Sequence, residues 1–142
     1  YLRDRYRVRT DREATVLMGT ATGAHAAVYT ALRYPALVGK VASQSLLSLG
    51  PHTESIVGGL PDDDARLELH MEWCTVEIWD PGESFDQRHE NERLVKMLRA
   101  AGHEVTAREI GSGTGWGTWR NHTGQLLAAL LPLTIDESKG RP

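Results

Sequence analysis

Several features that mark particular protein classes are scarce or missing in this sequence of 142 residues. Its only cysteine, Cys74, excludes a disulfide within the chain, and the apolar residues around it predict a buried, unreactive thiol. No segment approaches the ~20 consecutive apolar residues of a membrane-spanning helix. The charged start, YLRDRYRVR, also lacks the apolar core of a secretion signal. We therefore expect a cytoplasmic protein that does not associate with membranes.

The sequence also lacks a large excess of charge of either sign. It has 16 Lys and Arg residues against 19 Asp and Glu, a net charge of −3, which does not indicate nucleic acid or another strongly charged partner. His89-Glu90-Asn91-Glu92 has no partner histidine at metal-ligand spacing. The glycines of residues 111–117 alternate as G-x-G-x-G-x-G, which differs from the G-x-G-x-x-G of dinucleotide-binding loops. We expect no metal, no cofactor and no nucleic acid.

What the sequence does contain is an alternation of short apolar runs, which predict strands, and amphipathic segments, which predict helices. We predict helices over residues 2–9, 22–33, 64–71, 89–101 and 119–131, strands over 14–18, 38–43, 74–79 and 104–110, and a long loop over 49–64. Strands that alternate with helices imply an α/β fold, in which parallel strands are covered by helices on both faces. No linker divides residues 1–142, so we expect a single domain.

The turn after the first predicted strand is the most informative motif. Residues 15–25 read TVLMGTATGAH, in which Gly19 and Gly23 sit where a sharp turn and close helix packing require small residues. A G-x-S-x-G sequence at such a turn is the nucleophile elbow of α/β-hydrolases, which lifts a serine oxygen above the sheet. Here Ala21 occupies the serine position, so a methyl group replaces the attacking oxygen. The motif predicts a hydrolase scaffold without its nucleophile.

The surrounding sequence resembles the enterochelin (ferric siderophore) esterases and their esterase-D-like relatives. The similar features are YRVRTDR before the strand, the elbow itself, YP after the helix, SQS after the next strand, and the segment NERLVKMLRAAGHEV. The similarity continues to residues 112–120, where the family has G-G-H-D-W-x-x-W-R and this chain has SGTGWGTWR. The resemblance covers residues 4–132 and implies the α/β-hydrolase fold, present as the C-terminal half of the family's catalytic domain.

The resemblance also implies a role for single positions. The family's serine falls on Ala21 and its histidine on Thr114. Its acid falls on Glu83, in the loop after the third predicted strand, with Asp80 and Asp86 close enough to be alternatives. In a working triad the histidine takes the proton of the serine and the acid orients the histidine. Only the acid is therefore retained.

Other parts of the family's site are also implied. The amide of Thr22 would supply one oxyanion donor, whereas the second donor would come from a loop after an earlier strand that this sequence does not contain. Trp116 and Trp119 fall beside the family's pocket, and Trp79 ends a predicted strand on the same rim. These residues predict a substrate-binding cleft lined by aromatic side chains, with packing in the core as the alternative.

Three interpretations of the function follow. The first is a pseudoenzyme, an esterase-like protein that binds a small ester or siderophore-like ligand. The second is an active carboxylic ester hydrolase with a recruited nucleophile, for which Thr20, Thr22 and His25 are the candidates. The third is a structural half-domain that completes its sheet with the missing N-terminal half or with a second copy in a homo-oligomer. An engineered serine knockout at Ala21 is disfavoured by Thr114, because one inactivating change suffices.

Overall fold

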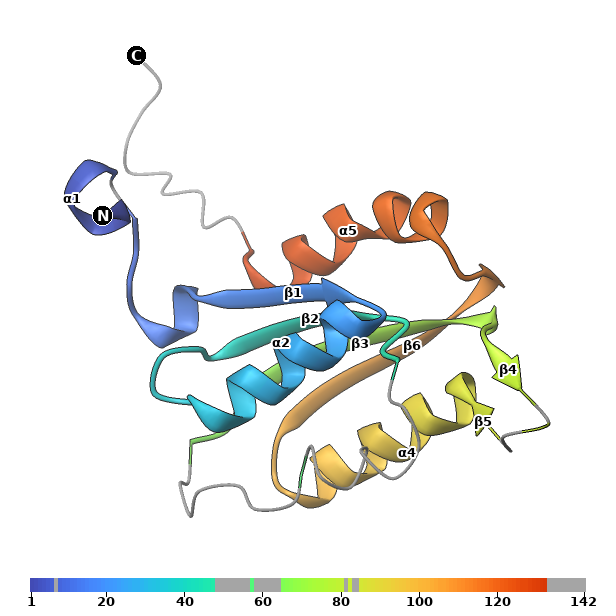
Figure 1. Ribbon diagram of the computed structural model, residues 1–142. Helices are drawn as coiled ribbons and strands as arrows, with labels where there is room; N and C mark the ends of the chain where they lie inside the picture. The colour runs from blue at the N-terminus through green and yellow to red at the C-terminus, as the bar shows by residue number, and fades with distance from the viewer. Residues whose placement is uncertain (7, 48–56, 58–64, 81, 83–84, 133–142) are drawn as a thin grey trace.

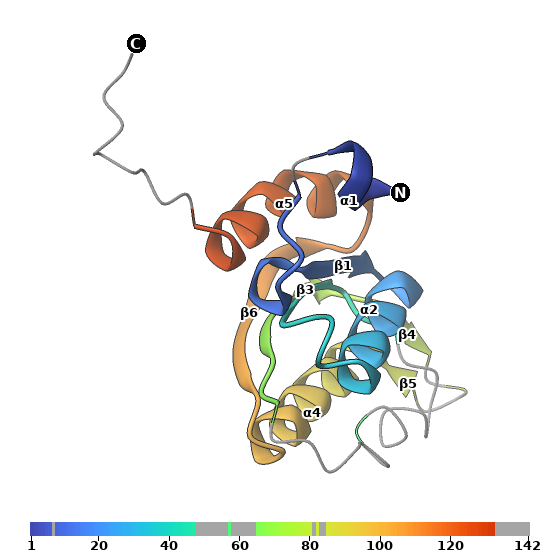
Figure 2. The same cartoon turned by 90° about the vertical axis from the view of Figure 1, so that its left-hand side faces the viewer.

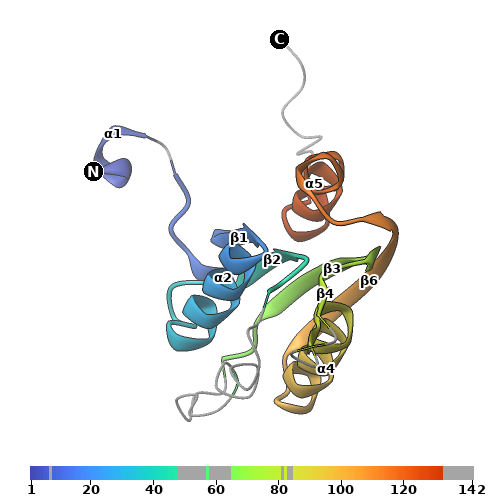
Figure 3. The same ribbon diagram turned by 45° about the vertical axis from the view of Figure 1, so that its right-hand side comes forward.

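The computed structural model describes residues 1–6, 8–47, 57, 65–80, 82 and 85–132. Its centre is a four-stranded parallel sheet in the order β1-β2-β3-β6, formed by Val16–Thr20, Lys40–Gln44, Glu68–Val76 and Glu104–Gly113 (Figure 1). Helices α2 (Thr22–Arg33) and α4 (Gln87–Ala100) cover one face, and α5 (Trp116–Leu130) covers the other (Figures 2 and 3). This arrangement confirms the predicted α/β fold.

Two apolar clusters hold the layers together. The larger cluster lies between the sheet and helices α2 and α4, and it includes Val28, Leu32, Val41, Leu69, Met71, Trp73, Leu94 and Leu98. The smaller cluster lies under α5 and contains Ala42, Leu126 and Leu130, with Val16 and Met18 packed against them. Full burial of a side chain such as Leu or Val contributes roughly 1.5–3 kcal/mol. Most of the apolar stabilisation therefore comes from the face that α2 and α4 cover.

The third strand differs from the prediction. We predicted a helix over 64–71 and a strand over 74–79, but the structure has β3 over Glu68–Val76. Leu67, Leu69, Met71 and Trp73 are all buried, and their period of two places them on one face of a strand. This alternation was the missed signal, because a helix would repeat its apolar residues every three to four positions.

Other boundaries shift by a few residues. Helix α1 covers only Leu2–Arg5 of the helix predicted over 2–9. Strand β6 continues through the first glycines to Gly113, which pairs with Val76 after a register shift in β3. Helix α5 begins at Trp116 rather than at residue 119. Apart from residue 57, the predicted loop over 49–64 lies outside the described residues.

A short antiparallel pair follows β3. Strand β4 (Trp79–Asp80) pairs with β5 (Phe85–Asp86), so Trp79 lies beyond the third strand of the main sheet rather than at its end. Asp86 then caps α4, because its carboxylate accepts the backbone N–H groups of Arg88 and His89 at 3.0 and 3.2 Å. In the described part of the chain, no helix is long and apolar enough to cross a bilayer.

Gly19 is required by a close approach between β1 and α2. A Cβ atom added to Gly19 would lie 2.2 Å from the carbonyl carbon and oxygen of Gly23. The backbones of the strand and the helix are therefore in direct contact at Gly19. A Cβ atom on Gly23 would meet no described atom within 4 Å. The steric requirement predicted from the sequence is therefore present at Gly19 and absent at Gly23.

This difference predicts opposite effects of one substitution. Gly19→Ala is expected to destabilise the fold by roughly 1–3 kcal/mol or more, because backbone must move to admit the methyl group. Gly23→Ala is the matched control and is expected to stabilise α2 by up to about 1 kcal/mol through helix propensity. Urea unfolding of the full-length protein, followed by circular dichroism, measures both. Equal losses of stability would contradict the close approach.

Candidate functional site

The turn between β1 and α2 holds Ala21 in a strained conformation. Its φ of 50° and ψ of −120° lie in a region that residues with a side chain rarely adopt, at a cost on the order of 1–3 kcal/mol. The Ala21 N–H donates to the carbonyl of Gln44 at 3.0 Å, and its own carbonyl accepts the amides of Ala24, His25 and Leu47 at 3.1–3.2 Å. The elbow is therefore held by both α2 and the segment after β2.

Thr22, the residue predicted to supply an oxyanion donor, comes directly after Ala21. Thr22 is the first residue of α2, so its N–H has no acceptor within the helix and lies at the positive end of the helix dipole. This group can donate a hydrogen bond to a carbonyl oxygen placed above Ala21. Thr20 lies at the end of β1, on the other side of the apex.

Ser45, directly after β2, is a second strained residue. It has a φ of 48° and is 1% exposed. Its N–H donates to the carbonyl of Glu72 at 2.7 Å, and its carbonyl accepts the side-chain amide of Gln87 at 2.6 Å. Its Oγ donates to Glu77 Oε1 at 2.6 Å and accepts from Thr114 Oγ1 at 3.2 Å. No role was predicted for Ser45 from the sequence.

Glu77 is the acidic group of this cluster. Besides the Ser45 hydroxyl, Oε1 accepts the N–H of Cys74 at 2.7 Å. Oε2 is buried and has no hydrogen-bond partner among the described residues. Burial raises the pKa of the Cys74 thiol, and the charge of Glu77 raises it further, while a bond to Ser45 lowers it. Cys74 is therefore a buried thiol with little thiolate character, as predicted.

These contacts bring four strand ends together. Ala21 follows β1, Ser45 follows β2, Glu77 follows β3 and Thr114 follows β6. Because all four strands are parallel, their carboxyl ends lie along one edge of the sheet (Figure 1). This edge is the candidate functional site, since parallel α/β sheets bind ligands beyond the carboxyl ends of their strands.

Glu83, Asp80 and Asp86 were the three candidates for the acid of the triad. Glu83 lies outside the described residues. The Asp80 backbone belongs to β4, and Asp86 is engaged as the cap of α4. Among the described residues, Glu77 is the carboxylate that contacts Thr114 through Ser45. The signal that could have found it is its place as the first acidic residue after the third strand.

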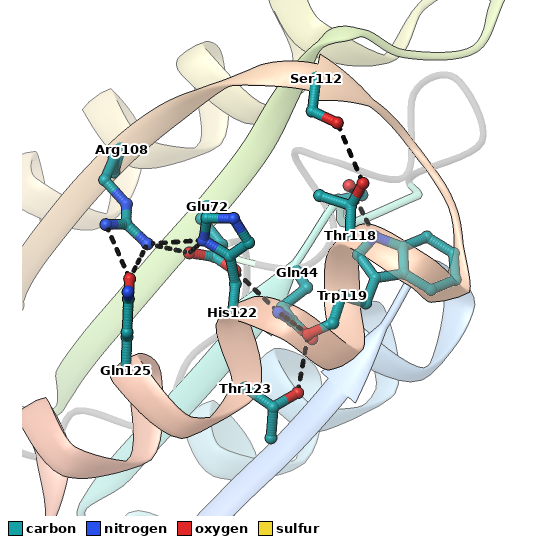
Figure 4. A network of polar contacts seen from close by, with 10 residues as sticks. Gln44, Glu72, Arg108, Ser112, Thr118, Trp119, His122, Thr123 and Gln125 are labelled. Atoms are coloured by element: carbon teal, nitrogen blue, oxygen red, sulfur yellow. Dashed lines mark hydrogen bonds and ion pairs between the residues drawn. The ribbon is translucent and has the colours of Figure 1, made fainter.

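A second polar network fastens α5 to the sheet (Figure 4). Glu72 is only 2% exposed, and its carboxylate accepts from Gln44 Nε2 at 2.7 Å and from Arg108 Nη2 at 2.8 Å. Gln44 Nε2 also donates to the carbonyl of Trp119 at 3.0 Å. His122 Nδ1 lies 3.9 Å from Glu72, on the same helix as Trp119. A buried carboxylate is tolerated only when it is paired in this way.

An aromatic cleft opens between the end of β1 and the start of α5. It has a volume of about 540 Å³ and is lined by Met18, Gly19, Thr20, Gln44, Trp116, Gly117, Trp119, Arg120 and Thr123. Trp116 is 77% exposed and packs edge-to-face on Trp119, with ring centroids 5.3 Å apart and an interplanar angle of 79°. The Trp119 indole N–H donates to Ser45 Oγ at 3.1 Å. Packing in the core, the alternative for these residues, is wrong for Trp116.

Comparison with known proteins agrees with this architecture. The chain matches the sequence model of the family Esterase over residues 1–131. It superposes on an enterochelin esterase from Shigella flexneri with a TM-score of 0.71 at 22% identity, covering 87% of this chain and 32% of that one. No curated protein sequence matches it. The resemblance inferred from the sequence is confirmed.

More distant esterases share the fold. A ferulic acid esterase gives a TM-score of 0.70 at 19% identity and covers 92% of this chain and 55% of its own. The S-formylglutathione hydrolase of Staphylococcus aureus gives a TM-score of 0.72 at 9% identity and covers 92% of this chain and 56% of its own. The chain thus spans between a third and about half the length of these proteins. At such identities the likeness shows the fold, and it confirms the predicted α/β-hydrolase fold.

The strain at Ala21 can be measured directly. Ala21→Gly is expected to stabilise the protein by about 1 kcal/mol, because glycine adopts a positive φ without steric cost. Ala26→Gly, at an exposed position within α2, is the matched control and is expected to destabilise it by about 1 kcal/mol. Thermal unfolding of both variants tests the difference in sign. A loss of stability in both would show that Ala21 is unstrained.

Proposed function

Because the chain belongs to the Esterase family, to which residues 1–131 match, we propose that it is a non-catalytic member that binds a ligand without hydrolysing it. The observation that carries this proposal is the methyl group of Ala21 at the apex of the strained turn. The family's chemistry needs a hydroxyl there to form a covalent intermediate. A carbonyl held above this apex meets no nucleophile from residue 21.

The position of the general base supports the same conclusion. A threonine hydroxyl does not accept a proton near neutral pH, so Thr114 cannot replace an imidazole. Its Oγ1–H is donated to Ser45, which in turn donates to Glu77. The hydroxyls of Thr114 and Ser45 and the carboxylate of Glu77 are therefore bonded to one another in a chain of hydrogen bonds.

Features suited to binding remain. The Thr22 N–H offers one donor for a carbonyl oxygen, and the cleft offers the faces of Trp116 and Trp119 beside the guanidinium of Arg120. Such a cleft suits an aromatic acyl group that carries oxygen substituents. Its fold relatives include enterochelin and ferulic acid esterases, and by analogy we propose an ester or siderophore-like aromatic ligand. The single buried thiol, Cys74, suits a cytoplasmic location, which we include in the proposal.

Recruitment of another nucleophile receives less support. Thr20 lines the cleft and Thr22 is exposed at the elbow. Within the described residues, no hydrogen bond joins either hydroxyl to a histidine or a carboxylate that would activate it. Hydroxyl nucleophiles need such a base within reach.

Single-turnover kinetics test the absence of catalysis. Mixing full-length protein in excess with p-nitrophenyl acetate is expected to release no stoichiometric burst of nitrophenol, because no acyl-enzyme can form at Ala21. Thr22→Val is expected to leave this result unchanged, as is Thr106→Val, a control at an exposed position of β6. A burst that disappears in Thr22→Val and persists in Thr106→Val would overturn the non-catalytic assignment.

Ligand titration tests the cleft. Binding of a ferulate or catecholate ester is expected to quench tryptophan fluorescence, because two of the four tryptophans line the cleft. Trp116→Ala is expected to weaken binding about tenfold, which corresponds to about 1.4 kcal/mol. Tyr34→Ala, an exposed aromatic residue after α2, is the control. Equal affinities of the two variants would exclude the aromatic cleft as the binding site.

We also propose that the β1 edge of the sheet is completed by further strands. In the described sheet, β1 lies at one edge and pairs only with β2. An unpaired parallel edge binds other strands or aggregates, and those strands can come from an N-terminal half or from a second copy. Light scattering of residues 1–142 alone is expected to give a dimer or aggregate. A monodisperse monomer would contradict this proposal.

A further inference from the structure

We propose that His103 is an acid-sensitive latch, which holds the amino end of β3 to the turn before β6 while its ring is neutral and releases it when the ring is protonated. His103 lies between α4 and β6, one residue before the first residue of β6 (Figure 1). The aromatic cleft lies at the carboxyl ends of β1 and β2, which is the opposite edge of the sheet. The latch is therefore separate from the candidate functional site and does not depend on the proposed function.

The ring takes the place of a strand partner at this edge. Paired register between β3 and β6 begins at Glu68 and Glu104. Leu67 lies one residue earlier, and its carbonyl accepts the N–H of Glu104 at 2.9 Å. The N–H of Leu67 donates to Nδ1 of His103 at 3.3 Å. The imidazole thus accepts the last amide at the amino end of β3, where the backbone ladder has not yet begun.

This contact fixes the protonation state of the ring. A backbone N–H can only donate, so Nδ1 carries no hydrogen and the neutral ring carries its hydrogen on Nε2. Nε2 is buried and has no hydrogen-bond partner among the described residues. A protonated ring would point a second N–H at the N–H of Leu67 and would have no acceptor for either of its own hydrogens. Burial lowers the pKa of His103, in agreement with a neutral ring.

The charged groups around the ring are paired with one another. His103 shares a pocket of about 410 Å³ with three cations and three carboxylates, which are Arg12, Lys40, Arg66, Glu13, Glu68 and Glu104. Lys40 Nζ lies 3.1 Å from Glu68, and Arg12 Nη1 lies 3.2 Å from Glu13. On α4, the guanidinium of Arg99 donates to the carbonyl of Val105. In the described part of the chain, no carboxylate is bonded to the ring to hold an imidazolium in place.

Protonation therefore opens the contact. Leu67 is only 1% exposed, so loss of the ring leaves its amide buried without an acceptor, which is unfavourable. The charged ring regains hydration by turning toward solvent. Because the lowered pKa favours the neutral ring in the folded state, the stability from this contact is complete well above pH ~6.5, the ordinary pKa of histidine. It is lost as the pH falls from that value through the lower pKa of the folded state.

NMR of the unchanged full-length protein tests the latch without any substitution. Long-range proton–nitrogen spectra at about pH 7.5 are expected to show the hydrogen of His103 on Nε2, and the ring is expected to titrate below pH ~6.5. Over the same range, the Leu67 amide is expected to lose protection against hydrogen exchange, after correction for its intrinsic rate. A hydrogen on Nδ1, or a Leu67 amide whose protection does not follow the titration, would overturn the proposal.

Two substitutions at this position separate the acceptor from the charge. The side-chain oxygen of asparagine can accept where Nδ1 does and does not titrate, so His103→Asn is expected to remove the pH dependence of this contact. Between about pH 7.5 and 5.5, the Tm of the unchanged protein is expected to fall roughly 3–6 °C further than that of His103→Asn. His103→Leu has a similar size and no acceptor, and it is expected to be less stable than His103→Asn at both pH values.

His89→Asn is the control, because it removes an exposed histidine of α4 and is expected to keep the pH dependence of the unchanged protein. An equal fall of Tm in the unchanged protein and in His103→Asn would refute the latch. If His103→Asn does not fold, the NMR measurements on the unchanged protein decide the matter. None of these readouts involves a ligand or ester turnover, so a nitrophenol burst would refute the proposed function and leave the latch untouched.

Discussion

The site depends on a backbone conformation that the chain would not adopt alone. Ala21 has a positive φ, and the carbonyl of Gln44 and the amide of Leu47 hold it there from either side of the end of β2. The segment after β2 is itself strained at Ser45 and is held by the side-chain amides of Gln87 and Asn91. Two strained residues are thus stabilised by each other's surroundings, which is possible only where packing over-determines both.

Trp119 joins the two polar networks that surround this backbone. Its carbonyl accepts from Gln44, which also donates to the buried Glu72, and its indole N–H donates to Ser45, which donates to Glu77. Each network directs hydrogen-bond donors to a carboxylate at the sheet, and both fasten the start of α5. The aromatic wall of the cleft is therefore fixed by the same hydrogen bonds that hold the residues after the strands. The aromatic cleft beside an apex that carries a methyl group is the physical basis of the proposed function.

The elements that were predicted well have local signals. The apolar run before Gly19 and the helical spacing of the buried residues in α2 were enough to place β1, the elbow and the helix that follows. Strand β3 was misassigned although Leu67, Leu69, Met71 and Trp73 alternate, because the charge of Glu72 interrupts the apolar run. That charge is tolerated since Arg108 and Gln44, from the two neighbouring strands, reach it. Such compensation is invisible until the strands are paired.

The sequence by itself determined which atoms are present: a methyl group at residue 21, a threonine at residue 114 and two tryptophans in the segment that follows. These are covalent facts, and local patterns and family resemblance predict a role for each. Only the tertiary structure decided that, among the described residues, the carboxylate of Glu77 is linked to Thr114 through the hydroxyl of Ser45. Ser45 bonds to Glu77, 32 residues away, and to Thr114, 69 residues away, and these contacts exist because parallel register aligns the ends of separate strands. Chain spacing carries no information about that alignment, since the intervening helices and loops can vary in length without changing it.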